Sequence, residues 1–263
     1  MMEEERQEGV LAVCRLLFAA AVCLAVLLTG TGSGRLSVSA ASRISMDITY
    51  ATYQREDGTL QIVDSNGAFV YDMIVVLVGG QLCYADKHGI VAQDQMFDFG
   101  GSKYFAKKDG SVAVNEICTK KDGSQVFATK DGTLAHDRSI SRNGNRYYIK
   151  SDYTIAADGF YKTAKGSQVY ARSDGTLITG RVFRANGNEY YAKSSGAIAK
   201  NGFCITERGS KIYADPFGVI ATNRRFFVNG RIYYAKKSGA LIRDGFYTIP
   251  SGKKVFAKDS GEL

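Results

Sequence analysis

Apolar and polar positions alternate along most of this chain in a pattern that repeats every 21 or 22 residues. Short apolar or aromatic runs are separated by turns of glycine and polar residues. The glycine that opens each copy stands at ten places: Gly58, Gly80, Gly101, Gly123, Gly144, Gly166, Gly187, Gly209, Gly230 and Gly252. Counting this glycine as position zero, position four is aromatic in nine of ten copies, position five is usually alanine, and position eleven is large and apolar. Such regularity indicates one small unit copied about ten times.

Each copy predicts a β-hairpin. A second glycine follows the first by nine residues in every copy but one, where Tyr153 stands instead and suggests a turn of another type. Two short apolar-aromatic runs joined by turns such as Lys108–Gly110 or Ser173–Gly175 are typical of hairpins, in which glycine supplies the positive φ. A single hairpin of this size is not stable in water. The sequence therefore predicts an all-β fold, a β-solenoid of about ten stacked β-hairpin repeats over residues 58–263.

The spacing also reveals a longer unit. After the first two copies, which have Gln61 and Cys83 at position three, copies followed by a 22-residue gap carry Tyr there, and the other class carries Val or Ile. The first class is represented by Tyr104, Tyr147, Tyr190 and Tyr233, the second by Val126, Val169, Ile212 and Val255. A long copy followed by a short copy makes a double repeat of about 43 residues.

The first 41 residues are of a different kind. Arg15 precedes the apolar run Leu16–Leu28, and small residues then lead to Ala40 and Ala41. This layout predicts a secretory signal peptide over residues 1–41, with an uncleaved membrane anchor as the alternative. Residues 42–57 are then a short N-terminal segment or cap. The expected location is secreted or on the cell surface, with no integral membrane role unless the anchor remains.

Charge and cysteine content narrow the choice of partners. The formal net charge of +8 falls mostly at turns, which is expected of a solvated hairpin surface or of one that attracts anionic wall polymers. Nucleic acid is not an expected partner, because the chain resembles no nucleic-acid module and carries an export signal. We expect Cys83, Cys118 and Cys204 to be buried thiols without a disulfide framework.

The aromatic side chains suggest a binding face. Because strand side chains alternate, positions three and five share one face and position four lies with the polar positions two and six. This arrangement predicts a ladder of flat rings that stack on sugars, and it predicts that Tyr191→Ala weakens glycan retention while the fold survives. In the alternative, the rings pack against Phe160, Phe183, Phe203, Phe226 and Phe246. The candidate ligand-binding residues are Tyr148, Tyr170, Tyr191, Tyr213, Tyr234, Phe160, Phe203 and Phe246.

A family resemblance rests on these motifs. The Gly-Phe pairs and the run Asn-Gly-Asn-Glu-Tyr-Tyr-Ala-Lys-Ser-Ser-Gly-Ala-Ile resemble the cell-wall-binding repeats of Gram-positive bacteria over residues 58–263. That superfamily includes choline-binding modules, glucan-binding repeats and the C-terminal repeats of clostridial toxins. The resemblance implies a β-hairpin solenoid that binds a cell-wall polymer or other surface glycan. Choline-binding repeats carry Trp where this chain has Phe160, Phe203 and Phe246, and again at position two, so the resemblance favours the glucan-type and toxin-type variants.

The sequence contains no recognisable catalytic constellation. His88 and His136 stand in or just after hairpin turns without a partner set, and no paired carboxylates, phosphate-binding loop or metal-ligand cluster stands out. We therefore expect no enzyme activity, no cofactor and no metal. Two functions remain open: a secreted or surface-attached module that binds carbohydrate, and a structural or adhesive stalk without a small-molecule site.

Overall fold

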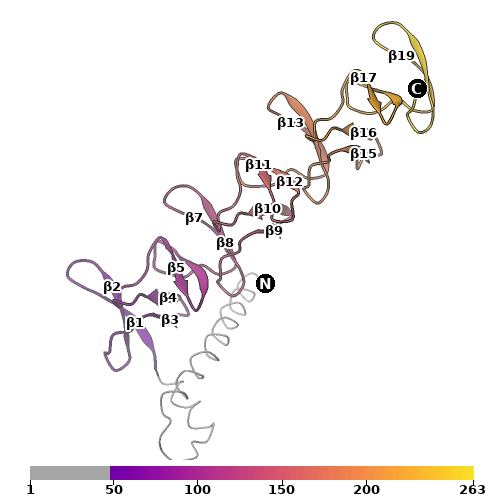
Figure 1. Cartoon of the computed structure of the whole chain (residues 1–263). Helices are drawn as coiled ribbons and strands as arrows, with labels where there is room; N and C mark the ends of the chain where they lie inside the picture. The colour runs from indigo at the N-terminus through magenta and orange to yellow at the C-terminus, as the bar shows by residue number, and fades with distance from the viewer. Residues whose placement is uncertain (1–47) are drawn as a thin grey trace, which may run out of the picture. The chain divides into compact units, whose positions relative to one another are not determined.

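A computed structural model describes residues 48–263, so the predicted signal peptide at residues 1–41 lies outside the described residues. Twenty strands follow one another along the chain, and residues 48–263 contain no helix (Figure 1). Each strand pairs with its neighbour in an antiparallel two-stranded sheet, which gives ten separate hairpins. The predicted all-β class and the ten hairpins are confirmed.

The strands are four or five residues long. Their bounds are β1 Tyr50–Gln54, β2 Leu60–Asp64, β3 Met73–Val76, β4 Leu82–Ala85, β5 Gln95–Phe99, β6 Ser102–Ala106, β7 Glu116–Thr119, β8 Gln125–Ala128, β9 Arg138–Arg142, β10 Asn145–Ile149, β11 Gly159–Lys162, β12 Gln168–Ala171, β13 Arg181–Ala185, β14 Asn188–Ala192, β15 Gly202–Ile205, β16 Lys211–Ala214, β17 Arg224–Val228, β18 Arg231–Ala235, β19 Gly245–Thr248 and β20 Lys254–Ala257. The opening glycine of each copy therefore lies in the turn between two paired strands. Part of the segment 42–57 forms β1, the first strand of the first hairpin.

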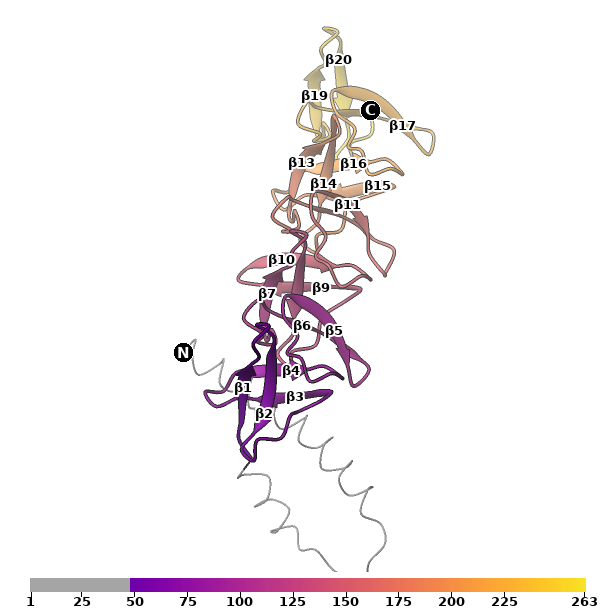
Figure 2. The same ribbon diagram turned by 90° about the vertical axis from the view of Figure 1, so that its left-hand side faces the viewer.

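The described chain divides into two compact units. The first runs to His136 and includes Ser151–Ile155, and the second comprises Asp137–Lys150 and Ala156–Leu263. In both units, the residue at position eleven donates its backbone N–H to the position-two carbonyl of the preceding hairpin. Examples are Leu134 to Lys103 in the first unit and Ile198 to Gln168 in the second, each 2.7 Å from nitrogen to oxygen. Neighbouring hairpins run in different directions, as β1–β2 and β3–β4 show (Figure 2).

These bonds place the position-eleven side chain in the core between hairpins. Ile155, Leu177 and Ile198 are 5%, 3% and 6% exposed, and the alanines at position five, such as Ala171 and Ala192, are fully buried. No single hairpin encloses these side chains. Each small core therefore forms only when adjacent copies stack, as the sequence predicts.

Left-handed backbone marks three places in each of the first nine copies: the opening glycine, the residue nine positions later, and a third site. In three of the long copies the turn is an Asn-Gly pair in which both residues have positive φ, as in Asn143 at 50° and Gly144 at 75°. Asparagine and glycine tolerate this region, which a tight hairpin turn requires. A third site, fourteen residues after the opening glycine, was missed in the sequence. It is left-handed at Asp72, Asp94, Asn115, Asp137, Asp158, Gly180, Asn201, Asn223 and Asp244.

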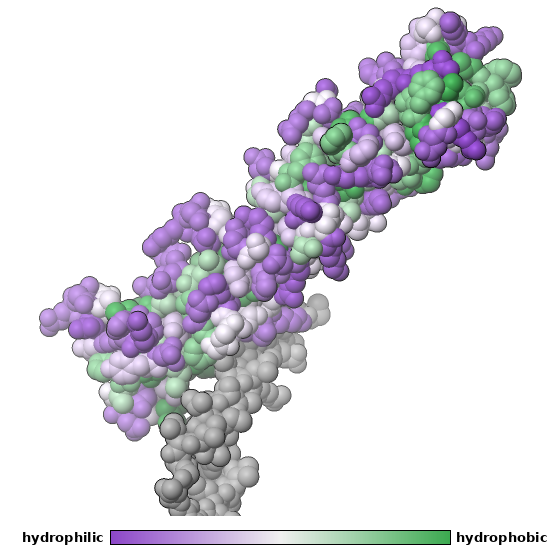
Figure 3. All heavy atoms as spheres, in the orientation of Figure 1, coloured by the Kyte–Doolittle hydropathy of each residue, from purple (hydrophilic) through white to green (hydrophobic). Residues whose placement is uncertain are grey.

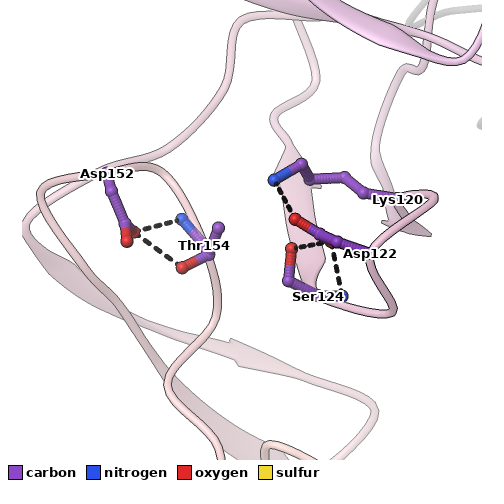
Figure 4. A network of polar contacts seen from close by, with 5 residues as sticks. All are labelled: Lys120, Asp122, Ser124, Asp152 and Thr154. Carbon is purple, nitrogen blue, oxygen red and sulfur yellow. Dashed lines mark hydrogen bonds and ion pairs between the residues drawn. The ribbon is translucent and has the colours of Figure 1, made fainter.

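The turn at Tyr153 keeps the hydrogen bonding of other Asp-containing turns. Thr154 donates its N–H and its hydroxyl to Asp152 Oδ1 at 2.9 and 2.6 Å. Ser124 makes the same two bonds to Asp122 at 2.9 and 2.6 Å (Figure 4). Tyr153 adopts φ of 69°, a value that a bulky residue rarely takes, and its ring packs partly buried against the core cluster that includes Phe105. The side-chain hydrogen bonds and the positive φ of this turn therefore match those of the glycine-containing turns, and the turn type itself stays a prediction.

The described cysteines are free thiols. Cys83 and Cys118 are buried, and burial raises the pKa of both to about 11. Cys204 is half-buried, and burial also raises its pKa. The thiolate is the reactive form, so burial lowers the reactivity of these cysteines at neutral pH, and Cys83 and Cys118 act as small apolar core residues.

We expect acid to weaken the fold through the Asp turns. Hydrogen bonds from Ser or Thr hydroxyls lower the pKa of Asp122 and Asp174 below the ordinary 3.8. A carboxyl with a lowered folded-state pKa stabilises the fold fully above its ordinary pKa, and this stabilisation is lost as pH falls further. Thermal unfolding followed by circular dichroism should thus give a level midpoint down to about pH 5 and a falling one below about pH 4.

Asp122→Asn and Asp174→Asn together provide the control, because asparagine still accepts the hydrogen bonds but does not titrate. The double variant should lose part of the acid dependence below about pH 4. An acid profile identical to that of the wild type would show that these turns do not contribute.

Candidate functional site

The position-four rings differ in burial from copy to copy. In the long copies they are buried: Phe105, Tyr148, Tyr191 and Tyr234 are 1%, 5%, 3% and 8% exposed. In the short copies Tyr170 and Tyr213 are half-buried. The expectation that Tyr148, Tyr191 and Tyr234 lie in a polar, open setting is therefore wrong. Neighbouring copies cover these hairpins on both faces, so alternation along the strand does not separate core from solvent.

The hydroxyl groups of the buried tyrosines are also engaged within the protein. Tyr148 accepts a hydrogen bond from the N–H of Ala164 and Tyr191 from that of Glu207, both at 3.1 Å. Tyr234 donates to Asn223 Oδ1, also at 3.1 Å. A buried tyrosine needs such a partner. These three residues thus connect each long hairpin to adjacent turns and linkers, and they do not present a free ring face.

Accessible rings gather instead where a short hairpin faces the next long one. Phe160 and Tyr170 are cross-strand partners in β11–β12, and Phe183 and Tyr190 are partners in β13–β14. The Phe160 centroid lies 4.8 Å from Tyr170 and 4.9 Å from Tyr190, and Tyr170 lies 5.0 Å from Phe183. Tyr190 is buried, and the other three rings are half-buried. We call these four residues the Phe160 cluster.

The same arrangement recurs one double repeat later. The Phe203 cluster consists of Phe203 and Tyr213 from β15–β16 with Phe226 and Tyr233 from β17–β18. The Phe203 centroid lies 5.1 Å from Tyr213 and 4.8 Å from Tyr233. The Lys211 ammonium lies 5.0 Å from the Phe203 centroid. The rings of the Phe160 cluster have no such contact with a cation of the described residues.

A third cluster, in the first unit, is closed. Tyr84, Phe97 and Tyr104 stack with centroids 4.2 and 5.4 Å apart, and they are 7%, 8% and 8% exposed. Tyr84 donates its hydroxyl to Asp72 Oδ1 at 2.8 Å, and burial followed by this bond raises the Tyr84 pKa to about 12. These rings serve as core.

Phe246 is placed differently from Phe160 and Phe203. Its ring is 78% exposed and contacts Phe256, itself 51% exposed, at 5.1 Å between centroids. The eight candidate residues therefore divide into the buried Tyr148, Tyr191 and Tyr234, the two cluster pairs Phe160 with Tyr170 and Phe203 with Tyr213, and the exposed Phe246.

Position-two side chains form contacts that the sequence did not indicate. The Arg146 guanidinium donates to the carbonyl of Ser195 at 3.1 Å, and the Lys211 ammonium donates to the carbonyl of Ser260 at 2.7 Å. Each carbonyl lies 49 residues further along the chain than its donor, in a turn of the hairpin two copies later. These cations are therefore not simply solvated charges. Their shared position two is the only sequence signal that pointed to a common role.

The remaining surface offers little other chemistry. Within residues 48–263, no group of three or more His, Cys, Asp or Glu side chains is placed to hold a metal ion. The same residues include no helix long and apolar enough to cross a membrane. Apolar patches lie between hydrophilic side chains on the face that Figure 3 shows. The aromatic clusters are therefore the features of this surface that most resemble a binding site.

Comparison with known proteins supports the fold at low sequence identity. No protein-family model matches the sequence, and no curated protein matches it. Among solved structures, choline binding protein F from Streptococcus pneumoniae, crystallised in the presence of a peptidoglycan analogue, is 21% identical with a TM-score of 0.57. That alignment covers 82% of this chain and 84% of that one. CbpJ from Streptococcus pneumoniae TIGR4 is 18% identical with a TM-score of 0.57, over 82% of this chain and 70% of that one.

The modular autolysin LytC from Streptococcus pneumoniae is 20% identical with a TM-score of 0.50, and the alignment covers 81% of this chain. This chain spans about half of the LytC chain, 52%. The ten hairpins and these alignments lead to one conclusion: the chain has the β-hairpin repeat fold of these three Streptococcus pneumoniae proteins, one of which is choline binding protein F.

Proposed function

We propose that the repeat region is a non-catalytic module that binds the carbohydrate of a cell wall or another surface glycan. The observation that carries this proposal is the pair of half-exposed aromatic clusters built around Phe160 and Phe203. Each combines two facing hairpins, and the two clusters recur at the interval of one double repeat. Flat apolar rings beside polar side chains suit a sugar, whose ring has an apolar C–H face and a hydroxyl edge.

The similar structures support this class of ligand. Choline binding protein F was crystallised with a tetrasaccharide-pentapeptide analogue of peptidoglycan, and LytC with a synthetic peptidoglycan ligand. We propose the same general partner, a cell-wall polymer or glycan, for this chain. Export through a signal peptide in residues 1–41 would bring the module to a secreted or cell-surface location.

A structural or adhesive stalk is the competing function. The burial of Tyr148, Tyr191 and Tyr234 favours it, because these rings and hydroxyls serve packing. A stalk, however, has no need for accessible rings at the Phe160 and Phe203 clusters. The two functions therefore predict different results. Removal of a cluster ring weakens the glycan retention of a binding module, whereas a stalk retains no glycan in the first place.

Sedimentation with purified Gram-positive cell walls and with insoluble α-glucan tests the proposal. The full chain should pellet with at least one of these materials, and Phe160→Ala should reduce retention about tenfold, which corresponds to about 1.4 kcal/mol. Phe227→Ala is a matched control, because Phe227 is 69% exposed and lies outside both clusters. A folded wild type that pellets with neither material would favour the stalk.

We also expect that choline does not bind. A quaternary ammonium is held by an aromatic cage, most strongly by Trp, and the chain contains no Trp. The Phe203 cluster moreover already holds the Lys211 ammonium at 5.0 Å. The protein should pass through a resin that carries choline-like groups at moderate salt. Retention on this resin with specific elution by free choline would contradict the prediction.

A further inference from the structure

We propose that the second compact unit carries a polyanion-binding surface: its exposed arginines contact the phosphate or carboxylate groups of a flexible, linear anionic polymer, and the first unit takes no part. This surface goes beyond the proposed function, which needs only the aromatic clusters. Three features of the chain support it: the distribution of charge between the two units, the choice of arginine as the cation, and a set of guanidinium groups without partners.

The two compact units differ in charge. Residues 48–136 and 151–155 of the first unit contain 8 basic and 12 acidic side chains, so their formal net charge is −4. The 122 residues of the second unit contain 22 basic and 9 acidic side chains, so its formal net charge is +13. A small domain is kept soluble by a net charge of about 2–8, and like charges on one unit repel each other and destabilise it. The excess of positive charge in the second unit therefore calls for a function.

The second unit also differs in the type of its cations. Eleven of its 22 basic residues are arginines, whereas the described residues of the first unit contain one arginine, Arg55, and seven lysines. Lysine is sufficient for solubility. The planar guanidinium instead presents parallel N–H donors that match the oxygens of a carboxylate or a phosphate. The enrichment in arginine thus indicates a partner with anionic oxygen groups.

The first unit neutralises more than half of its lysines internally. Four of the seven lie 2.8–4.0 Å from a carboxylate oxygen: Lys103 with Asp98, Lys107 with Glu116, Lys120 with Asp122 and Lys121 with Asp94. The last hairpins of the second unit contain ion pairs of the same kind, between Arg231 or Lys258 and Glu262, and between Arg243 and Asp259. A basic residue in this fold is therefore often matched by an acidic neighbour.

Other arginines of the second unit have no such match. Five arginines are exposed, and among the described residues their guanidinium groups take part in no ion pair, hydrogen bond or ring contact: Arg138, Arg181, Arg184, Arg208 and Arg224. Arg138, Arg181 and Arg224 are the first residues of β9, β13 and β17, and they recur at intervals of 43 residues. The first residue of β5, in the first unit, is the neutral Gln95. The double repeat thus presents an unpaired guanidinium at a fixed place in the second unit, and the first unit lacks it at β5.

The placement of these arginines suits a flexible polymer. Successive long hairpins of the second unit are turned relative to one another, as β9–β10 and β13–β14 show (Figure 2). Their strands therefore do not form the single ribbon that enters a groove of duplex DNA. A flexible chain can pass from one hairpin to the next. One exposed guanidinium binds a single anion weakly, but a polymer with repeated charges engages several at once, which raises the overall affinity.

Elution from immobilised long-chain polyphosphate and from immobilised poly-L-glutamate tests the inference, with the sodium chloride concentration at elution as the readout. The full chain should be retained at low salt on at least one column, and the column that needs more salt identifies the anionic group. The triple variant Arg138→Gln, Arg181→Gln and Arg224→Gln should bind about tenfold more weakly and elute earlier, because each lost cation lowers both the affinity and its salt dependence. Replacement of the same arginines by lysine keeps the charge, so this variant should elute between the two.

Lys87→Gln, Lys108→Gln and Lys130→Gln together are the matched control, because they remove the same charge from exposed lysines of the first unit. This variant should elute with the wild type. Both triple variants should keep the wild-type unfolding midpoint, since they change only exposed side chains. Equally early elution of the two would show that total charge alone matters, and it would overturn the assignment to the second unit.

Two further results would contradict the inference in different ways. If neither column retains a folded wild type that still pellets with neutral α-glucan, the polyanion surface is wrong while the proposed function stands. If duplex DNA displaces the protein from polyphosphate at a lower phosphate concentration than soluble polyphosphate does, the partner is a nucleic acid and the polymer class is wrong.

Discussion

Tyr191→Ala is expected to lower the free energy of unfolding by about 3–5 kcal/mol, in the range found for large buried aromatic side chains. The Tyr191 ring is 3% exposed and packs against Ala199, Ile212 and Ile220. Its hydroxyl accepts the Glu207 N–H at 3.1 Å. The variant would thus leave a cavity between two hairpins and remove the partner of a backbone donor. Urea denaturation followed by circular dichroism measures the effect.

Tyr191→Phe is the matched control, because it keeps the ring and removes only the hydroxyl. Its cost should be about 0.5–1.5 kcal/mol, the usual net value of one hydrogen bond. The sequence alone favoured the opposite result, an intact fold with weaker glycan retention. A Tyr191→Ala variant as stable as the wild type but unable to bind glycan would restore that first interpretation.

Ile198→Ala should destabilise the protein by about 2–5 kcal/mol. Ile198 is 6% exposed and packs with Tyr190 and Ala192, and the turn of Gly218 packs on its side chain. Its backbone N–H also joins its hairpin to Gln168 of the preceding one. The substitution therefore affects the contacts of three successive hairpins. The measurement is again the free energy of unfolding in urea.

Ile205→Ala removes the same number of carbon atoms from a side chain that is 55% exposed. It should change stability by about 0.5 kcal/mol or less, as surface substitutions usually do. Equal destabilisation by Ile198→Ala and Ile205→Ala would show that position eleven is not the core between hairpins.

The spacing of glycine and apolar residues was sufficient to predict the fold. Residues such as Gly144 and Ile198 recur because every copy needs the same turn and the same contact with its neighbour. Two local signals can be read directly from a sequence. One is a turn that requires positive φ, and the other is an apolar position that has no partner in its own hairpin. The number of hairpins and the core role of position eleven followed from them.

The site was less predictable, because strand alternation tells which side chains share a face but not which face is covered. Tyr191 was placed on an open face, whereas stacking covers it. Tyr170 and Phe160 were named correctly as rings that lie close together, although the sequence left open whether they pack or bind. The partners of the position-two cations were not visible either. Arg146 and Lys211 are polar residues at position two, and only the three-dimensional contacts show that they donate to the carbonyl groups of Ser195 and Ser260.

The central claim, that this repeat protein binds carbohydrate without acting on it, is tested most directly by a glycan array probed with the full purified chain. We expect binding to one structural group of glycans, loss of that binding in Phe160→Ala, and no change in the mass of a bound soluble oligosaccharide after long incubation. A folded protein that binds no glycan on the array would contradict the claim and support a stalk, and cleavage of the bound oligosaccharide would contradict the absence of catalysis.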